Sequence, residues 1–367
     1  MNILFGIYYT MDDPDSQGVF LELQRHASRV SVFARYGVRD EGRDRGAEDA
    51  EQYVLDVLAR RVTASGIDVV LARGLHGYFR EEAQASEFRA RVAPCRLVEL
   101  SEYYPYQLHE AIKGDMRSIA VQSQFDLVLC GCHASVERLR EYGVNAAYYP
   151  SPAQRSLWDI PASMAVPRLS CDVLMPFGSC YRATTHPTDS DRVMLPNAFL
   201  DAGLTNLRIY GGSRDPALNP WLQADPELAP WMRPETPCAD MRRVMRSAKI
   251  GINTSVIGDN AATPPRGYFS DRLPSLLLAG TMALTDNPIS VTTPWTVGDT
   301  TVQMEDGVHL ATFGTIDEAV EQARYYLTHD EERQRIAQTG HDFAVAHLTE
   351  TEAIGVIAMG AIKALLA

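Results

Sequence analysis

Short apolar runs alternate with segments of helical periodicity along the chain. In its first half, apolar runs predict strands at residues 3–8, 29–34, 67–72, 95–100, 125–130 and 146–149. Helical patterns stand between them at residues 51–63, 109–121 and 134–142. Several runs are rich in Val and Leu, as strands covered on both faces are. The alternation predicts an α/β fold with a doubly wound parallel sheet.

The same rhythm returns after an interruption at residues 151–170, where Pro152, Pro161 and Pro167 stand without a sustained period. Further strands are expected at residues 171–176, 207–210, 249–253 and 282–285, and helices at 192–202, 239–247 and 271–279. We therefore expect an N-terminal Rossmann-like domain at 1–150, a linker at 151–169 and a second Rossmann-like domain at 170–348.

The tail predicts three further helices. Thr315 and Glu318 form a capping box that opens a helix over residues 316–327. A second helix begins at Asp330 and is expected to end at Gly340, since glycine commonly terminates helices. The last, within residues 349–367, is expected to pack back across the cleft between the domains.

Composition narrows the class of protein. At 367 residues, each domain is large enough for its own core. The longest nearly apolar run, residues 275–284, is well short of the about 20 residues of a membrane span, and the N-terminus lacks the basic region of a signal peptide. We therefore expect a cytoplasmic protein without a membrane span. The net charge of −13 argues against a general attraction to nucleic acid or anionic membranes.

The cysteines give no sign of a metal site. They lie at positions 95, 130, 132, 171, 180 and 238, without a Cys-x-x-Cys pair or a His–Cys cluster of zinc spacing. We expect buried free thiols and no bound metal. With only three lysines in the chain, Lys113, Lys249 and Lys363, a phosphate clamp would consist mainly of arginine.

A pattern near the C-terminus points to a family. Gly267-Tyr-Phe-Ser-Asp-Arg272 is followed by Leu-Leu-Leu-Ala-Gly280, then by Ala-Leu-Thr-Asp286 and by Glu305-Asp-Gly307-Val-His309 on an expected hairpin. This order resembles the end of GT-B glycosyltransferases, most closely the bacterial and phage branch related to spore-maturation (group 1) enzymes. The resemblance implies two Rossmann-like domains facing a cleft. It also implies hexosyl or pentosyl transfer from a nucleotide-sugar, UDP-linked by expectation, with no metal and no other cofactor.

The same resemblance indicates a donor site in the second domain. Ser270, Asp271 and Arg272 open the helix expected at residues 271–279, where backbone amides and a guanidinium can hold a diphosphate. Tyr268 either packs against the donor or covers the loop. Ser275 stands where many GT-B enzymes carry a ribose-binding Glu, which the phage-like branch often lacks.

Other donor-site candidates follow two strands of this domain. Gly178, Ser179 and Arg182 come after the strand expected at 171–176, and Gly211 comes after the strand at 207–210. Ordinary capping and turn formation remain the alternative role for each of these residues.

An inverting transferase also needs a base beside the acceptor. Three loops that follow strands of the first domain offer one: the loop with Asp12 and Asp13, the loop with His76, and the loop with Glu102. His76 is preferred, because Gly74 and Gly77 flank it and an unperturbed histidine titrates near neutral pH. A retaining enzyme would need no such base.

The acceptor stays open, with a glycan, a small metabolite and DNA as candidates. A phage-type DNA glycosyltransferase acting on hydroxylated bases is the first alternative, because residues 35–45 and Arg60-Arg61 are arginine-rich, although acidic residues such as Asp40 and Glu41 interleave with them. A non-catalytic sugar-nucleotide-binding module is the second. A nucleotide-sugar epimerase of the same architecture is the third.

Overall fold

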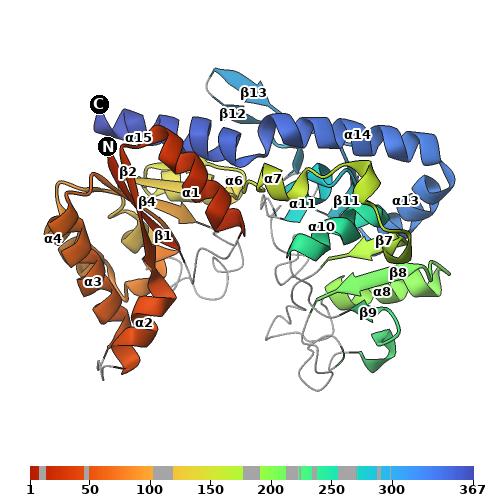
Figure 1. Cartoon of the computed structure of the whole chain (residues 1–367), viewed down its shortest axis with the longest axis horizontal. Coiled ribbons are helices and arrows are strands. Elements are labelled where there is room, and N and C mark those ends of the chain that lie inside the picture. Colours follow the sequence, from red (N-terminus) through yellow and green to blue (C-terminus); the bar gives the residue numbers. More distant parts are fainter. Residues whose placement is uncertain are drawn as a thin grey trace. The chain divides into compact units, whose positions relative to one another are not determined.

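The computed structural model describes residues 1–7, 14–44, 49–101, 119–176, 191–211, 222, 225–233, 238–254, 270, 272–286, 291–297 and 299–367. The chain divides into two compact units (Figure 1). The first comprises Met1–Pro150, Val297–Asp299 and Glu350–Ala367, and the second comprises Ser151–Thr296 and Thr300–Thr349. Each unit contains a six-stranded parallel sheet, which confirms the predicted α/β class.

The sheet of the first unit has the strand order β2-β1-β3-β4-β5-β6, with parallel pairing throughout. Its strands are β1 (Asn2–Ile7), β2 (Arg29–Ala34), β3 (Val69–Arg73), β4 (Arg96–Ser101), β5 (Leu127–Cys130) and β6 (Ala146–Tyr148). Each coincides with a predicted strand to within two residues at either end. The order reverses between β1 and β3, and this reversal is where doubly wound sheets bind ligands.

Helices cover both faces of this sheet. They are α1 (Pro14–His26), α2 (Arg35–Asp44), α3 (Ala50–Ser65), α4 (Glu82–Val92), α6 (His133–Glu141), the π-helix η7 (Thr351–Ala358) and α15 (Met359–Leu366). One apolar core joins Val19 and Leu23 of α1 to Phe5 of β1 and to Ile354 and Met359 of the C-terminal helices. In Figure 1, α3 and α4 lie together on the other side of the sheet. The helix predicted within residues 349–367 is present as η7 and α15, and it belongs to the core of the first unit.

The sheet of the second unit has the order β14-β11-β10-β7-β8-β9. Its strands are β7 (Cys171–Met175), β8 (Leu207–Tyr210), β9 (Met232–Arg233), β10 (Ala248–Asn253), β11 (Met282–Asp286) and β14 (Ala311–Phe313). Counted from β7, this is the 3-2-1-4-5-6 order of a dinucleotide-binding sheet, and the order reverses between β7 and β10. A separate two-stranded sheet pairs β12 (Trp295–Val297) with β13 (Thr300–Val302).

The helices of the second unit include α7 (Arg155–Trp158), α8 (Asp191–Asp201), α10 (Cys238–Ser247), α11 (Arg272–Leu278), α13 (Ile316–Thr328) and α14 (Asp330–His347). The predicted capping box of α13 is present: Glu318 donates its amide to Thr315 Oγ1 at 3.2 Å, and Thr315 donates its amide to Glu318 Oε2 at 3.2 Å.

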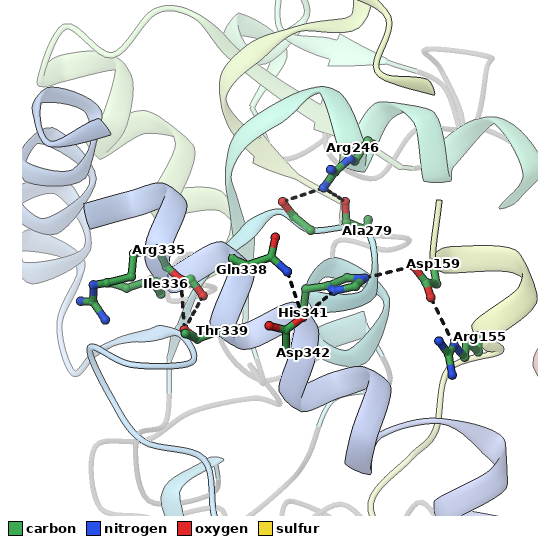
Figure 2. Close-up of polar contacts among 11 residues, drawn as sticks. Arg155, Asp159, Arg246, Ala279, Arg335, Ile336, Gln338, Thr339, His341 and Asp342 are labelled. Atoms are coloured by element: carbon green, nitrogen blue, oxygen red, sulfur yellow. Dashed lines mark hydrogen bonds and ion pairs between the residues drawn. The ribbon is translucent and has the colours of Figure 1, made fainter. Parts of the chain in front are cut away.

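Residues 151–169, expected to link the domains, lie within the second unit and contain α7. Asp159, directly after α7, lies 3.0 Å from His341 Nε2 of α14 and accepts a hydrogen bond from Arg155 Nε at 3.2 Å (Figure 2). The amide of Val166 donates to Ser247 Oγ of α10 at 2.8 Å. These contacts attach the segment to the helices around it.

The predicted helix end at Gly340 is wrong, because α14 continues to His347. Gly340 faces the turn at residues 305–310, and a Cβ placed on it would lie 2.2 Å from the carbonyl oxygen of His309 and 2.9 Å from Leu277 Cδ2. Arg335 and Thr339 of the same helix donate to the carbonyls of Gly307 and Val308. Glycine is thus required here for close approach rather than for termination.

We expect Gly340→Ala to destabilise the protein. Alanine improves helix propensity by at most about 1 kcal/mol, whereas forcing a methyl group into a packed contact costs about 1–3 kcal/mol. Gly360→Ala in α15 is the matched control, because a Cβ there meets no atom within 4 Å, and it should be neutral or stabilising. Urea unfolding followed by tryptophan fluorescence compares the two. Equal stability of both variants would contradict the close-packing role of Gly340.

Candidate functional site

The carboxyl ends of the strands at the two order reversals are where ligands are expected. The structure describes five of the predicted site residues: His76, Gly211, Ser270, Arg272 and Ser275. The others lie outside the described residues: Asp13, Glu102, Gly178, Ser179, Arg182, Tyr268 and Asp271.

In the first unit, His76 lies directly beyond β3, one of the two strands at the reversal. It belongs to a single 3₁₀ turn, η1 (Leu75–Tyr78), which Gly74 opens with a left-handed φ of 61°. A side chain at position 74 would be strained in this conformation, so glycine is required there. Leu75 is fully buried and anchors the turn in the core of the unit. The side chain of His76 is 20% exposed to solvent.

Glu99 holds this turn from the neighbouring strand β4 and has no exposed surface. Its Oε2 accepts a hydrogen bond from the amide of Leu75 at 3.0 Å, and its Oε1 lies 3.1 Å from His76 Nδ1. An ionised carboxylate can only accept, so the proton of a neutral His76 lies on Nδ1 and its Nε2 carries the lone pair. This is the arrangement of a general base oriented by a carboxylate.

Glu99 was not among the predicted site residues, although its place in the sequence carries a signal. In the strand Arg96-Leu-Val-Glu-Leu-Ser101, Glu99 is the one charged position among apolar neighbours in the middle of a buried run. A charged group in such a place needs a partner, and that requirement singles it out.

A second histidine lies at the carboxyl edge of this sheet, at the start of α6 after β5. The ring of His133 stacks on Tyr148 with centroids 3.6 Å apart, and its Nε2 is a buried atom that makes no hydrogen bond in the described part of the chain. Burial lowers the pKa of His133 from its ordinary 6.5 to about 4. The ring is therefore neutral at pH 7.

His133 should make stability depend on pH. Between pH 6.5 and about 4 the unfolded chain binds a proton at this ring that the folded protein does not, so its contribution to stability is present above pH 6.5 and is lost as the pH falls towards 4. The loss is of order 1–3 kcal/mol. His133→Phe keeps a ring on Tyr148, and we expect it to flatten urea-unfolding stability measured between pH 7 and 4.5. Parallel pH profiles for the two proteins would contradict this role.

In the second unit, three of the four described donor-site candidates lie at the start of α11. Ser270 precedes the helix: its carbonyl accepts from the amide of Leu273 at 3.1 Å, and its Oγ lies 3.4 Å from the amide of Arg272. Arg272 is the first helical residue. Ser275 lies one turn further on and is buried, as are all residues from Leu273 to Leu278.

Helix α11 is held firmly on the sheet. A Cβ on Gly251 of β10 would lie 2.4 Å from Leu276 Cδ2, so the helix packs directly on the backbone of that strand. At its other end, Arg246 Nη1 donates to the carbonyls of Ala279 and Gly280 at 2.9 and 3.2 Å (Figure 2). Burial lowers the pKa of Arg246, while the nearby charge of Asp159 opposes that shift. This cap satisfies carbonyls that a helix end leaves without partners.

Gly211, the fourth described donor-site candidate, has its backbone amide already hydrogen-bonded within the sheet. It follows β8 with a φ of 154°, and its amide already donates to the carbonyl of Arg233 at 3.2 Å. That amide belongs to the pairing of β8 with β9, so Gly211 can offer a ligand close approach but not this hydrogen bond. Within the described ranges, no group of three His, Cys, Asp or Glu side chains is placed to hold a metal, and no helix is long and apolar enough to cross a membrane.

Comparison with known proteins gives a family for part of the chain. Residues 194–353 match the family model described as glycosyl transferase-like. These residues include Ser270, Arg272 and Ser275. No curated protein matches the chain.

Solved structures resemble the whole chain at low sequence identity. HepE of Anabaena, in complex with UDP and glucose, is 13% identical with a TM-score of 0.66, covering 99% of this chain and 100% of its own. A glycosyltransferase from Rickettsia africae is 10% identical with a TM-score of 0.65, covering 100% and 98%. An alpha-glucosyltransferase in complex with UDP-glucose and DNA containing an abasic site is 10% identical with a TM-score of 0.62, covering 100% of both chains.

At these identities the likenesses establish the fold, and they confirm the predicted GT-B class. The match of residues 194–353 to a glycosyl transferase-like family agrees with the predicted glycosyltransferase function. Residues 194–353 thus match a glycosyl transferase-like family model, within a chain that has the GT-B fold.

Proposed function

We propose that the protein transfers a sugar from a UDP-linked donor to an acceptor hydroxyl without the help of a metal. The observation that carries the proposal is the glycosyl transferase-like match of residues 194–353, which places Arg272 and α11 inside the matched domain. HepE and the alpha-glucosyltransferase were solved with UDP or UDP-glucose, and this makes UDP the first nucleotide to test. Within GT-B, we assign the chain to the bacterial and phage branch that residues 267–272 resemble.

The second unit would bind the donor. Breaking the bond between the anomeric carbon and the diphosphate leaves negative charge on the departing nucleotide. The guanidinium of Arg272 can stabilise this charge by donating paired hydrogen bonds to the diphosphate. In other enzymes a bound metal ion stabilises such charge. Arg272 begins α11, whose packing on β10 and whose Arg246 cap hold it in place.

The first unit would activate the acceptor. If the reaction inverts configuration, the acceptor hydroxyl gives its proton to His76 Nε2 as its oxygen attacks the anomeric carbon. Glu99 keeps the proton of Nδ1 in place and stabilises the imidazolium that forms. If the reaction retains configuration, His76 would act only as a hydrogen-bonding group towards the acceptor.

The test begins with the wild-type protein. Its melting temperature is measured with UDP, GDP, dTDP and CMP and their common sugar conjugates. A ligand at about 100 times its dissociation constant adds about 2.7 kcal/mol, which raises the melting temperature visibly. We expect the uridine compounds to stabilise, and slow release of glucose from UDP-glucose without acceptor would exclude a non-catalytic module. No stabilisation by any nucleotide would contradict the proposal.

DNA is the second candidate acceptor, because an alpha-glucosyltransferase solved with DNA shares the fold along the entire chain. The arginine-rich stretch supports it less than its sequence suggested. Arg35 is only 1% exposed and cannot contact a phosphate backbone, and Arg39 lies 3.9 Å from Asp40. Arg60 and Arg61 are exposed. Salt-dependent binding of duplex DNA, lost in Arg60→Ala, would favour this acceptor, and salt-independent or absent binding would exclude it.

A further inference from the structure

Asn253 stands at the reversal of strand order in the second unit. It is the last residue of β10, which neighbours β7 on one side and β11 on the other. It pairs with Thr285 of β11, and both side chains are fully buried.

The hydrogen bonds of Thr285 fix the orientation of the Asn253 side chain. Thr285 Oγ1 donates its single proton to the carbonyl of Asp286 at 3.1 Å. It must therefore accept from Asn253, whose Nδ2 lies 2.9 Å away. The amide nitrogen thus faces β11, and the carbonyl oxygen Oδ1 faces away from Thr285.

Asn253 Oδ1 is a buried acceptor, and no donor for it stands among the residues that the structure describes. It makes no hydrogen bond to any group in the described part of the chain. Native proteins pair nearly all such atoms, and an exception calls for a role such as ligand binding. Its place at the carboxyl edge of a dinucleotide-type sheet, at the order reversal, is where a ligand can supply the missing donor.

The chemistry of the oxygen limits that ligand group. A carbonyl oxygen accepts hydrogen bonds and repels phosphate oxygens, so Asn253 would not bind the diphosphate. Nucleotide-sugars carry neutral hydroxyl donors on both the ribose and the transferred sugar. We propose that Asn253 Oδ1 accepts a hydrogen bond from one of these hydroxyls and is a specificity-determining residue of the donor site. This inference rests on the proposed function, and it divides recognition between Arg272 for charge and Asn253 for a hydroxyl.

The test combines a protein change with ligand changes. Asn253→Leu keeps a similar volume and removes the acceptor. Dissociation constants of UDP and UDP-glucose are measured by calorimetry for both proteins. We expect Asn253→Leu to weaken binding about 5- to 100-fold, the effect of leaving a buried donor unpaired. Loss for both ligands assigns the hydroxyl to the ribose, and loss for UDP-glucose alone assigns it to the hexose.

A ligand-side deletion checks the same bond without disturbing the fold. For wild type, 2′-deoxy- and 3′-deoxy-UDP, or UDP-glucose lacking single hexose hydroxyls, should include one compound that binds as weakly as the normal ligand binds Asn253→Leu. With that compound the variant should lose nothing further, since both changes remove one interaction. Asn197→Leu is the matched control, because Asn197 of α8 bonds only Asp225 among the contacts that the structure gives it, and its dissociation constants should stay unchanged.

The outcomes separate this inference from the function on which it rests. A wild-type protein that binds no UDP compound contradicts the proposed function and the role of Asn253 with it. Tight wild-type binding with Asn253→Leu within twofold contradicts only the role of Asn253. If the variant melts lower without ligand, the deoxy series on wild type decides, and losses below twofold for every deoxy compound overturn the inference.

Discussion

His76→Ala is expected to lower kcat/KM for glycosyl transfer about 10²- to 10⁴-fold, the usual worth of a positioned general base. His76 lies on a short turn after β3, and its Nδ1 faces the buried carboxylate of Glu99, so that Nε2 is the nitrogen able to take a proton. Initial rates with saturating donor measure the effect, and UDP binding should remain as in wild type. A variant that keeps its activity within threefold would exclude His76 as the base and would favour a retaining reaction.

Glu99→Gln tests the same pair through the positioning residue. The glutamine is of similar size, but its amide can face His76 Nδ1 as a donor and so favour the tautomer whose Nε2 carries the proton. We expect kcat to fall with little change in KM for the donor. The limb of the pH–rate profile that reports the base should also change, which a purely structural role would not produce. Glu87→Gln, at an exposed position of α4, is the matched control and should leave both constants unchanged.

Much of the fold could be predicted because its strands are buried on both faces. Apolar side chains must then stand at consecutive positions, as they do in β1, β3 and β5. The elements that were missed give weaker signals. Helix α4 buries only Ala85, Phe88 and Val92, and β9 is two residues long. The end of α14 was predicted wrongly, because Gly340 packs against the carbonyl of His309. This tertiary contact leaves no pattern in the local sequence.

Site features that depend on neighbouring residues in the sequence could be predicted. Contacts that depend on how two strands pair could not. A helix start at residues 271–272 follows from the pattern of Ser270 and the apolar run behind it, and α11 begins there. The pairing of His76 with Glu99 depends on β3 and β4 lying side by side in register, with Ala72 opposite Glu99. The orientation of the Asn253 amide depends in the same way on Thr285 across the β10–β11 pair. No local pattern encodes these cross-strand partners.

Arg272→Ala is expected to lower kcat/KM about 10²- to 10³-fold, because it removes a charged donor from the departing diphosphate. Affinity for UDP should fall about 10- to 100-fold, the worth of a hydrogen bond to a charged group. Arg272→Lys keeps the charge without the planar fork and should recover only part of both losses. Arg168→Ala, at an exposed arginine of the same unit, is the control and should bind UDP as wild type does.

The effects of Arg272→Ala and His76→Ala can be told apart, because the two residues belong to different units. Arg272 belongs to the second unit and His76 to the first, so the arginine variant should lose nucleotide-induced thermal stabilisation while the histidine variant keeps it. Full UDP affinity in Arg272→Ala would place the diphosphate elsewhere, and the donor site would then have to be sought among other residues of the second unit. Loss of UDP affinity without loss in Arg168→Ala would instead fix the diphosphate at the start of α11. With the position of the diphosphate known, the deoxy ligands would then show which hydroxyl of the donor contacts Asn253 of β10.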